Sequence, residues 1–169
     1  MKNRKITGIM ACDPKGVIGL KGRMPWSYPK EFEYFYQIVK NNIIVMGHKT
    51  FDSLPSKILQ NCICIVFSKN IPAQSSDNGV FFVKSLDEFW GVIKLFSNKK
   101  IFMVGGAEIA TFFLKQNLID EFLLTKINKD YEGDAFFPLD LLKGWDSMMI
   151  DKTNNYQIYK FTKNAIMNI

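Results

Sequence analysis

The chain has 169 residues, of which 47% are hydrophobic and 22% are charged, a composition that excludes an intrinsically disordered protein. It carries 22 Lys and Arg against 16 Asp and Glu, for a net charge of +6, but the basic residues are scattered along the sequence. The charge therefore favours an anionic small-molecule ligand, and nucleic-acid binding is only weakly indicated. We expect residues 1–169 to form a single domain and, by size alone, a monomer.

Cysteine and histidine are scarce. Three cysteines, an odd number, argue against a disulfide framework and predict a reducing compartment, the cytoplasm. With one histidine and no cysteine pair other than Cys62 and Cys64, no metal site is expected. No apolar run is long enough to span a membrane, and the short run 6–12 ends in Asp13 and Pro14, which predicts a strand and a turn rather than a secretory signal.

Apolar runs bounded by Gly, Pro and Asn predict strands that alternate with helices. In chain order the predicted strands are 5–12, 42–46, 62–67, 80–83, 101–104, 121–127, 146–150 and 156–161, and the predicted helices are 28–40, 48–53, 86–96 and 107–115. Alternation over the first two thirds favours parallel pairing, whereas the last two strands follow each other across a polar turn and predict an antiparallel hairpin. Ser85 is the expected N-cap of helix 86–96, with Glu88 completing a capping box.

The segment MPWSYPKEF at 24–32 places an acid in an aromatic setting at the start of a helix. Pro29 suits the first turn, and Ser27 is the expected N-cap. Glu31, Phe35 and Ile38 fall on one helix face, so the carboxylate joins the edge of an apolar stripe. Such a carboxylate needs strong partners or takes up a proton, and a planar amidine-like ligand edge would suit its two oxygens. The alternative interpretation is a solvated first-turn acid favoured by the helix dipole.

Two strands run through glycine straight into a helix. Strand 42–46 passes through Gly47 to His48, Lys49 and Thr50, and strand 101–104 passes through a glycine pair at 105–106. Unpaired N–H groups at a helix start bind anions, and glycine lets a phosphate approach the backbone. Neither a G-x-G-x-x-G nor a G-x-x-x-x-G-K-[ST] motif is present, so the junctions predict a ligand with several phosphates outside the standard nucleotide motifs. His48 is expected to contact phosphate or backbone, because no acid near it in sequence would orient it as a base.

Short motifs run in order through residues 6–161. They are Ile9-Met10-Ala11, Gly16-Val17-Ile18-Gly19, Met24-Pro25-Trp26 with an acid five residues later, Val45-Met46-Gly47 with Lys49-Thr50, Ser68, Val104-Gly105-Gly106, Leu124-Thr125, Glu132-Gly133-Asp134 and Phe137-Pro138. This ordered set resembles dihydrofolate reductase. The resemblance implies an α/β fold: a single domain with a central eight-stranded, mostly parallel mixed sheet, four flanking helices and an antiparallel C-terminal hairpin.

The resemblance also implies NADPH-dependent reduction of 7,8-dihydrofolate, or a closely related dihydropterin, to the tetrahydro form used in one-carbon metabolism. Hydride would pass to C6 while N5 gains a proton, with water as the expected proton source. Glu31, Trp26 and Thr125 match catalytic positions: Glu31 would grip the pterin's ring nitrogen and 2-amino group, and Thr125 would support Glu31. The implied substrate-binding residues are Ala11, Glu31, Phe32, Phe35, Leu54, Lys57 and Thr125.

NADPH is the implied cofactor. Residues 13–26 match a mobile loop that closes over the nicotinamide, and the glycine pair at 105–106 matches one that the family joins by a cis peptide. The implied cofactor-binding residues are Ala11, Ile18, Gly19, Gly47, His48, Lys49, Thr50, Ser68, Lys69, Val104, Gly105, Gly106, Ala107, Glu108 and Ile109. Within this set Lys49, Thr50, Ser68 and Lys69 match the positions that hold the phosphates, including the 2′-phosphate.

Two positions depart from the family pattern. Cys62 falls where the family has an arginine that pairs with the glutamate tail of folate, and a cysteine cannot replace a bidentate guanidinium. Lys57 is the candidate substitute, although a lysine is less directional. Ala110 falls where the family usually has a tyrosine near the nicotinamide, so a wall of the site would be lost.

Two other functions remain open from the sequence. One is a reductase of the same fold that acts on another heterocycle, such as a pyrimidine of riboflavin synthesis; Trp26 with Glu31 argues against it, and the missing arginine keeps it open. The other is a non-catalytic pterin- or RNA-binding protein on the same scaffold, which the basic charge favours and the intact glycine junctions oppose.

Overall fold

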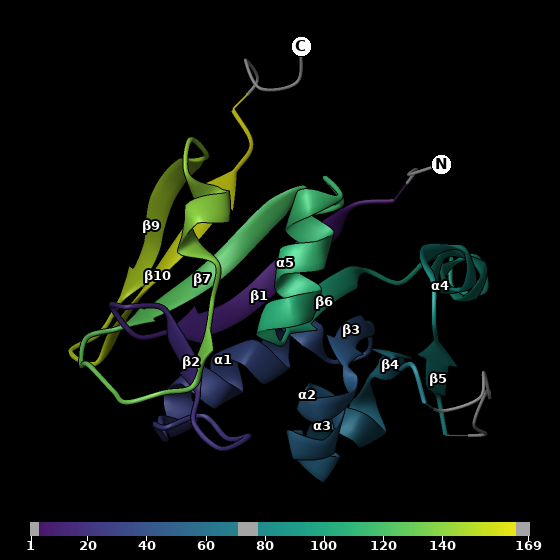
Figure 1. Ribbon diagram of the computed structural model, residues 1–169, viewed down its shortest axis with the longest axis horizontal. Helices are drawn as coiled ribbons and strands as arrows, with labels where there is room; N and C mark the ends of the chain where they lie inside the picture. The colour runs from purple at the N-terminus through teal and green to yellow at the C-terminus, as the bar shows by residue number, and fades with distance from the viewer. Residues whose placement is uncertain (1–3, 71–77, 165–169) are drawn as a thin grey trace.

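The computed structural model describes residues 4–70 and 78–164. Its centre is a sheet of eight strands: β1 (Ile6–Cys12), β3 (Ile43–Gly47), β4 (Ile63–Phe67), β5 (Val80–Val83), β6 (Ile101–Gly105), β7 (Glu121–Ile127), β9 (Asp146–Lys152) and β10 (Tyr156–Thr162) (Figure 1). Their order across the sheet is β5-β4-β3-β6-β1-β7-β10-β9. The first six in this order pair in parallel, and β10 pairs antiparallel with β7 and β9. The predicted α/β fold with a mixed sheet and a C-terminal hairpin is confirmed.

Five α-helices accompany the sheet within the described ranges: α1 (Pro29–Val39), α2 (His48–Ser53), α3 (Ser56–Asn61), α4 (Leu86–Ile93) and α5 (Ala107–Lys115), with one 3₁₀ helix, η1 (Leu139–Leu142). The sequence predicted four helices and missed α3. This helix is six residues long and follows α2 after only two residues, so it shows no helical periodicity of its own. A small second sheet of β2 (Val17–Gly19) and β8 (Ala135–Phe136) was missed for the same reason of length.

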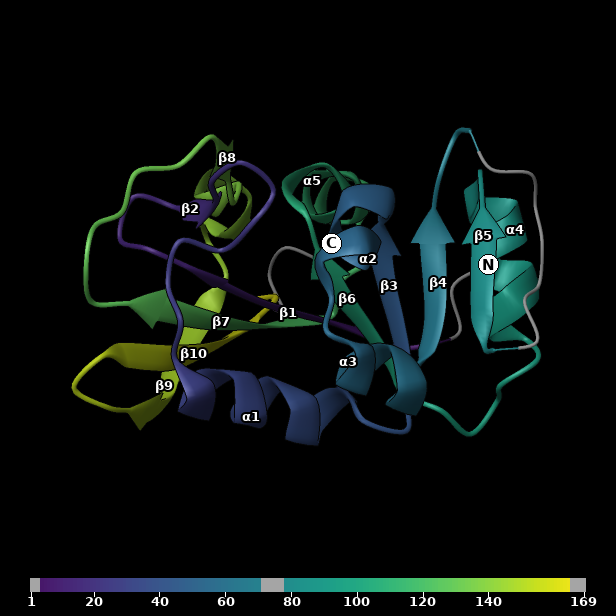
Figure 2. The ribbon, with the colours of Figure 1, turned by 90° about the horizontal axis from the view of Figure 1, so that it is seen from below.

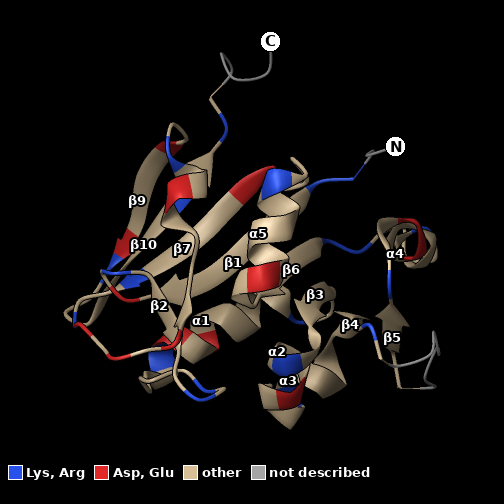
Figure 3. Cartoon of the chain, in the orientation of Figure 1, with Lys and Arg blue, Asp and Glu red and all other residues tan. Residues whose placement is uncertain are grey.

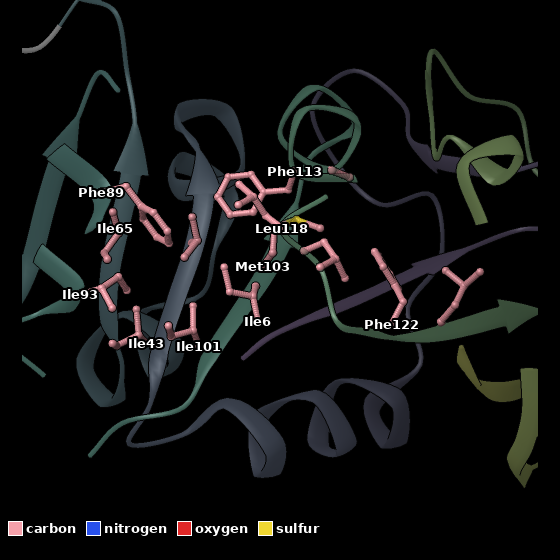
Figure 4. Close-up of a cluster of buried hydrophobic side chains, with 14 of the residues drawn as sticks. Ile6, Ile43, Ile65, Phe89, Ile93, Ile101, Met103, Phe113, Leu118 and Phe122 are labelled. Atoms are coloured by element: carbon pink, nitrogen blue, oxygen red, sulfur yellow. The ribbon is translucent and has the colours of Figure 1, made fainter. Parts of the chain in front are cut away.

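Both faces of the central sheet are covered. Alternate residues of a strand point to opposite faces, and in β3 Ile43 and Val45 pack in a cluster with α4 and α5 (Figure 4), whereas Ile44 and Met46 pack in a second cluster with α1 and α3. All four side chains are fully buried. Figure 2 shows α1 along one face of the sheet and α5 on the other. Because both faces are dry, the central strands are continuous apolar runs, which made them predictable.

The two N-cap predictions had different outcomes. Ser85 caps α4 as predicted: its Oγ accepts a hydrogen bond from the Glu88 N–H at 3.2 Å, and the Glu88 carboxylate accepts one from the Lys84 N–H at 2.7 Å. The Ser27 prediction was wrong, because Tyr28 is the N-cap of α1 and makes no side-chain cap bond. Pro29 occupies the first helical position, so the cap is the residue directly before it and Ser27 lies one residue too early.

Strand β9 forms one edge of the sheet and is exposed along its whole length. Met148, Met149 and Ile150 lie on it with exposed fractions of 62%, 49% and 44%. The register with β10 shifts in the middle, because Ile158 pairs with Asp151 and the next residue pairs with Met149. Ile150 therefore has no opposite residue in the ladder, which makes it the extra residue of a β-bulge.

Charged residues of both signs are spread over the described elements rather than gathered on one of them (Figure 3). No helix within residues 4–70 and 78–164 is long and apolar enough to cross a membrane.

Candidate active site

The carboxyl ends of neighbouring parallel strands carry most of the predicted site residues. Across β4, β3 and β6, Ser68 follows the first strand, Gly47 ends the second and Gly105 ends the third. β1 and β7 continue the row, with Ala11 paired to Thr125. In sheets of this kind ligands bind beyond the carboxyl ends of the strands. The topology therefore gathers at one edge residues that lie far apart in sequence.

The two glycine junctions face each other. A Cβ atom added to Gly106 would lie 3.3 Å from Thr50 Oγ1, and one added to Gly47 would lie 3.2 Å from Ile109 Cγ1. The first turns of α2 and α5 therefore approach each other at positions without side chains. Gly105 has a φ of 107°, and its peptide bond to Gly106 is cis, as the resemblance implied.

Helix α5 begins with Ala107, and its N-cap Gly106 makes no side-chain cap bond. Its first N–H groups are thus not used by a capping side chain, as an anion site requires. Glu108 is an exposed acid in the first turn, where it would face such an anion with the wrong charge. Val104, at the end of β6, packs on the cluster of α1 and α3.

Glu31 lies in the first turn of α1 and is half-buried. Among the described residues, its carboxylate has neither a hydrogen-bond donor nor an ion-pair partner. Burial raises the pKa of Glu31 from 4.5 to about 7. A solvated surface acid would show no such shift, so the helix-dipole interpretation of Glu31 does not account for this position.

Two further polar groups lack partners, and one of them, the Tyr34 hydroxyl, lies close enough to feel the charge of Glu31. The Trp26 Nε1–H and the Tyr34 hydroxyl are both buried without a hydrogen-bond partner among the described residues. Both side chains belong to one aromatic cluster built on Tyr156 and Ile158. Burial, followed by the charge of Glu31, raises the pKa of Tyr34 to about 12. Buried polar groups are rarely left unpaired in proteins, so a carboxylate and two donors without partners mark a place for a polar ligand or water.

Sequence analysis missed Tyr34, although a signal was present. Tyr34 lies three residues after Glu31 in a helix, so the two side chains share a face.

Thr125 of β7 is buried, with 2% of its surface exposed, and Ala11 packs on the aromatic cluster that contains Trp26 and Tyr34. No hydrogen bond joins Thr125 to Glu31 within the described part of the chain, so the supporting role of Thr125 stays a prediction.

The predicted apolar walls lie together. Phe32 and Phe35 of α1 and Leu54, just after α2, are half-buried and pack on the same cluster of α1 and α3. Phe51 of α2, which sequence analysis did not single out, joins this cluster and packs edge-to-face on Phe82 at 5.8 Å between ring centres. An aromatic layer therefore extends from α1 to α2.

The loop 13–26 is tied down by Asp13, which is 1% exposed. Its Oδ1 accepts hydrogen bonds from the N–H groups of Lys15 (2.9 Å) and Val17 (2.7 Å), and its Oδ2 accepts one from the N–H of Tyr131 (2.9 Å). The Tyr131 ring lies 5.5 Å from that of Trp26, and its hydroxyl lies 3.1 Å from that of Tyr28. One carboxylate thus holds the start of this loop against the loop after β7 and next to Trp26.

A second tie lies further along the same loop. The Asp134 N–H donates to Gly19 O at 2.9 Å, and the Lys21 N–H donates to the Asp134 carboxylate at 3.1 Å. Gly19 ends β2, and Ile18 of the same strand packs on the larger core cluster. Both predicted cofactor positions on β2 are therefore set by the pairing of this loop with residues 134–136.

We expect Asp13→Asn to destabilise the protein by about 2 kcal/mol, because the amide puts an N–H where a backbone N–H now donates. Urea unfolding followed by fluorescence measures the change. The matched control is Asp130→Asn, an exposed aspartate in the loop that contains Tyr131, which should shift stability by less than about 0.5 kcal/mol. Equal effects of the two variants would contradict the role assigned to Asp13.

His48 lies between two polar partners. Its Nδ1 is 3.4 Å from Ser68 Oγ, and its Nε2 is 3.5 Å from Asp52 Oδ1. The expectation that no acid orients His48 was wrong, because Asp52 is one helical turn further along α2 and lies on the same face. Ser68 is 8% exposed, whereas Lys49 and Lys69 are exposed.

Comparison with known proteins identifies the family. A family model described as dihydrofolate reductase matches residues 5–165. A putative dihydrofolate reductase of Caenorhabditis elegans is 34% identical over 171 residues, covering 92% of this chain and 86% of that one. The dihydrofolate reductases of Lactococcus lactis (33% over 135 residues; 79% and 77%) and Ureaplasma parvum (31% over 142 residues; 83% and 84%) are also similar. The chain belongs to the dihydrofolate reductase family.

Membership of the dihydrofolate reductase family makes the protein an oxidoreductase.

Both positions that depart from the family pattern, Cys62 and Ala110, are buried in the structure. Cys62 is 8% exposed, and its Sγ donates to Val39 O at 3.4 Å, so it faces the core. Ala110 is fully buried at the start of α5, and its N–H donates to Gly106 O at 2.9 Å.

Lys57, the candidate for the substrate tail, is already engaged. Its Nζ lies 3.4 Å from Glu33 Oε2 and 4.1 Å from the centre of the Tyr36 ring. An incoming carboxylate would therefore compete with Glu33 for this cation.

Among the described residues, no three His, Cys, Asp or Glu side chains gather in a way that could hold a metal ion.

Proposed function

We propose that the protein catalyses the NADPH-dependent reduction of 7,8-dihydrofolate, or a closely related dihydropterin, to the tetrahydro form, with hydride added at C6 and a proton at N5. The observation that carries this proposal is Glu31: a half-buried carboxylate that has no partner among the described residues, with its pKa raised to about 7 by burial. A flat heterocycle with a ring N–H and an amino group side by side would supply the two donors that this carboxylate lacks.

The residues at the carboxyl edge fit a dinucleotide with phosphates. At Gly47 and Gly106 an added Cβ would meet Ile109 and Thr50, so glycine at these positions lets the starts of α2 and α5 lie close together at the same edge. Lys49, Lys69 and the N–H groups at the start of α5 would hold the negative charge. When bound, NADPH supplies the hydride.

The chain's own residues would perform the remaining tasks. Glu31 orients the ring and, as an anion, favours positive charge that develops on it. Phe32, Phe35 and Leu54 form the apolar walls, and loop 13–26 excludes bulk water. The proton at N5 comes from water.

The single central sheet, covered on both faces, supports one domain over residues 1–169. The monomeric state, the absence of a nucleic-acid partner and the cytoplasmic location stay predictions.

The direct test is NADPH oxidation, followed at 340 nm, with 7,8-dihydrofolate and with dihydropteroate, which lacks the glutamate tail. We expect turnover of both. NADPH binding without turnover of either substrate would reject the dihydropterin assignment and favour another heterocycle, and failure to bind NADPH would reject the reductase.

The tail contact gives a second prediction. Because Cys62 faces the core and Lys57 is paired with Glu33, we expect the KM values of dihydrofolate and dihydropteroate to differ by less than about threefold. Lys57→Ala should leave this ratio unchanged. A preference for dihydrofolate above tenfold that disappears in Lys57→Ala would instead show that Lys57 binds the tail.

A further inference from the structure

The β-bulge in β9 places a carboxylate on the sheet face that carries α1. Ile158 of β10 is buried in the aromatic cluster that also contains Tyr34 of α1, and Asp151 is opposite Ile158 in the ladder. Opposite residues of an antiparallel ladder share a face, so Asp151 lies on the side of Ile158. In a regular ladder Ile150 would be opposite Ile158, and Asp151 would lie on the other face. Figure 2 shows the start of α1 close to β10 and β9.

The Tyr34 hydroxyl lies within range of two carboxylates. It is buried and has no hydrogen-bond partner among the described residues. Burial, then the charge of Glu31, then that of Asp151 raise the pKa of Tyr34 to about 12. Glu31 approaches from the preceding turn of the same helix, and Asp151 approaches from β9. The single hydrogen of this hydroxyl therefore has two carboxylates as alternative acceptors.

The other titratable groups of the cluster are three tyrosines. Burial, followed by the charges of Glu31 and Asp151, also raises the pKa of Tyr156 on β10. The hydroxyls of Tyr28 and Tyr131 lie 3.1 Å apart, so they are partners of each other. A cation, Lys129, lies 5.4 Å from the centre of the Tyr131 ring. Within the described part of the chain, the hydroxyl that is buried, unpartnered and affected by both carboxylates is that of Tyr34.

The direction of the hydroxyl hydrogen favours one charge state of Glu31 over the other. When Tyr34 donates to Glu31, the hydrogen bond stabilises the ionised carboxylate. When Tyr34 donates to Asp151, its oxygen is left to accept from Glu31, which favours the protonated carboxyl group. The two carboxylates therefore compete for one donor, and an ionised Asp151 opposes an ionised Glu31. Solvent screens the direct repulsion from the exposed Asp151, so the shared hydroxyl is the stronger link.

We propose that Tyr34 is a positioning residue that links the charge of Asp151, on the edge strand, to the charge of Glu31 in the active site. Its hydroxyl donates to one carboxylate or the other, directly or through one water. A carboxylate on the edge strand thereby helps to set the fraction of Glu31 that is ionised and able to bind two donors of a heterocycle. The inference rests on the proposed function for the role of Glu31, whereas the link itself is a property of the protein without ligands.

NMR of isotope-labelled glutamate carboxyl groups tests the link in the protein without ligands, with the Glu31 signal assigned by its loss in Glu31→Gln. We expect Asp151→Asn to lower the midpoint of the Glu31 titration by about 0.5 to 1 pH unit, because Tyr34 then donates to Glu31 alone. In a Tyr34→Phe background the same substitution should move the midpoint by less than about 0.2 pH unit. Asp146→Asn removes an equal charge from the other end of β9 and should leave the midpoint unchanged.

Two results would overturn the inference. One is an unchanged Glu31 midpoint in Asp151→Asn, and the other is a shift of the same size with and without the Tyr34 hydroxyl, which would show direct repulsion between the carboxylates. The pH dependence of kcat/KM for the dihydropterin should move with the NMR midpoint. A linked Glu31 in a protein that reduces no dihydropterin would reject the proposed function and keep the link. A working reductase whose Glu31 midpoint ignores Asp151 would do the reverse.

Discussion

Replacing Glu31 with glutamine is expected to lower kcat at pH 7 by at least about a hundredfold while leaving NADPH binding intact. The amide keeps the size of the side chain but loses the negative charge and one acceptor, so it neither matches two adjacent donors nor favours a developing cation. Stopped-flow or steady-state absorbance at 340 nm measures the loss. The wild-type rate should also vary between pH 6 and 8, because burial sets the pKa of Glu31 at about 7, and the variant should lose this dependence.

The same substitution should make the folded protein more stable at alkaline pH. The pKa of Glu31 rises from 4.5 to about 7 on folding, so the folded state favours the protonated form. The stability linked to this proton is fully present below pH 4.5 and is lost as pH rises through 7. Glu31→Gln cannot lose it, so we expect the variant to exceed wild type by about 2 to 3 kcal/mol at pH 8 and to match it near pH 4.5.

Glu33→Gln is the matched control for both effects. Glu33 lies two residues away on the same helix, is exposed and pairs with Lys57. Its removal should leave turnover unchanged and have little effect on stability, because exposed ion pairs contribute little. A Glu31→Gln variant with wild-type turnover, or one whose stability follows pH as wild type does, would remove Glu31 from the site as described.

Gly105→Ala is expected to destabilise the protein by about 2 to 4 kcal/mol and to weaken NADPH binding at least tenfold. Gly105 has a φ of 107°, a conformation that residues with a Cβ rarely adopt, and a Cβ there would lie 2.8 Å from Met10 Cε. The Met10 side chain can move, so the backbone term accounts for most of the cost. Relief of the strain would displace the start of α5. Urea unfolding and fluorescence titration with NADPH measure the two effects.

Substitutions at two other glycines separate the cost of the backbone conformation from the cost of steric contact at Gly105. Gly22 has a φ of 81° but nothing within 4 Å of an added Cβ, so Gly22→Ala should cost only the backbone term, about 1 to 2 kcal/mol. Gly91 is exposed within α4 with open space around it, and Gly91→Ala should stabilise by about 0.5 to 1 kcal/mol. A cost for Gly105→Ala no larger than that for Gly22→Ala would mean that the junction tolerates a side chain.

The sequence predicted the central strands well and the short elements poorly. β3 and β4 are buried on both faces, so each is an uninterrupted apolar run that predicts a strand without knowledge of the strands it pairs with. β2 and β8 have three and two residues, and what fixes them is their pairing across more than a hundred residues of sequence rather than their own composition. The local sequence pattern does not reveal a pairing strand that lies so far away in the sequence.

The site shows the same division. Glu31 and the glycine junctions have local signatures, namely an acid on an apolar stripe and a strand that ends in glycine. Asp13 has none, because its importance comes from the Tyr131 N–H on a distant loop. Asp52 was missed for a different reason: it is four residues from His48, and only a helical reading of 48–53 applied to side chains would have paired them.

The β-bulge in β9 affects how strongly the protein self-associates at high concentration. An open strand edge with three exposed apolar residues normally invites another chain to extend the sheet, which is the first step toward fibres. At Ile150 the row of outward donors and acceptors is broken, and Asp146 and Lys152 place charges at the two ends of the strand. A second chain that docked here would find only a few residues in register. The edge can therefore carry apolar side chains in the open without acting as a template.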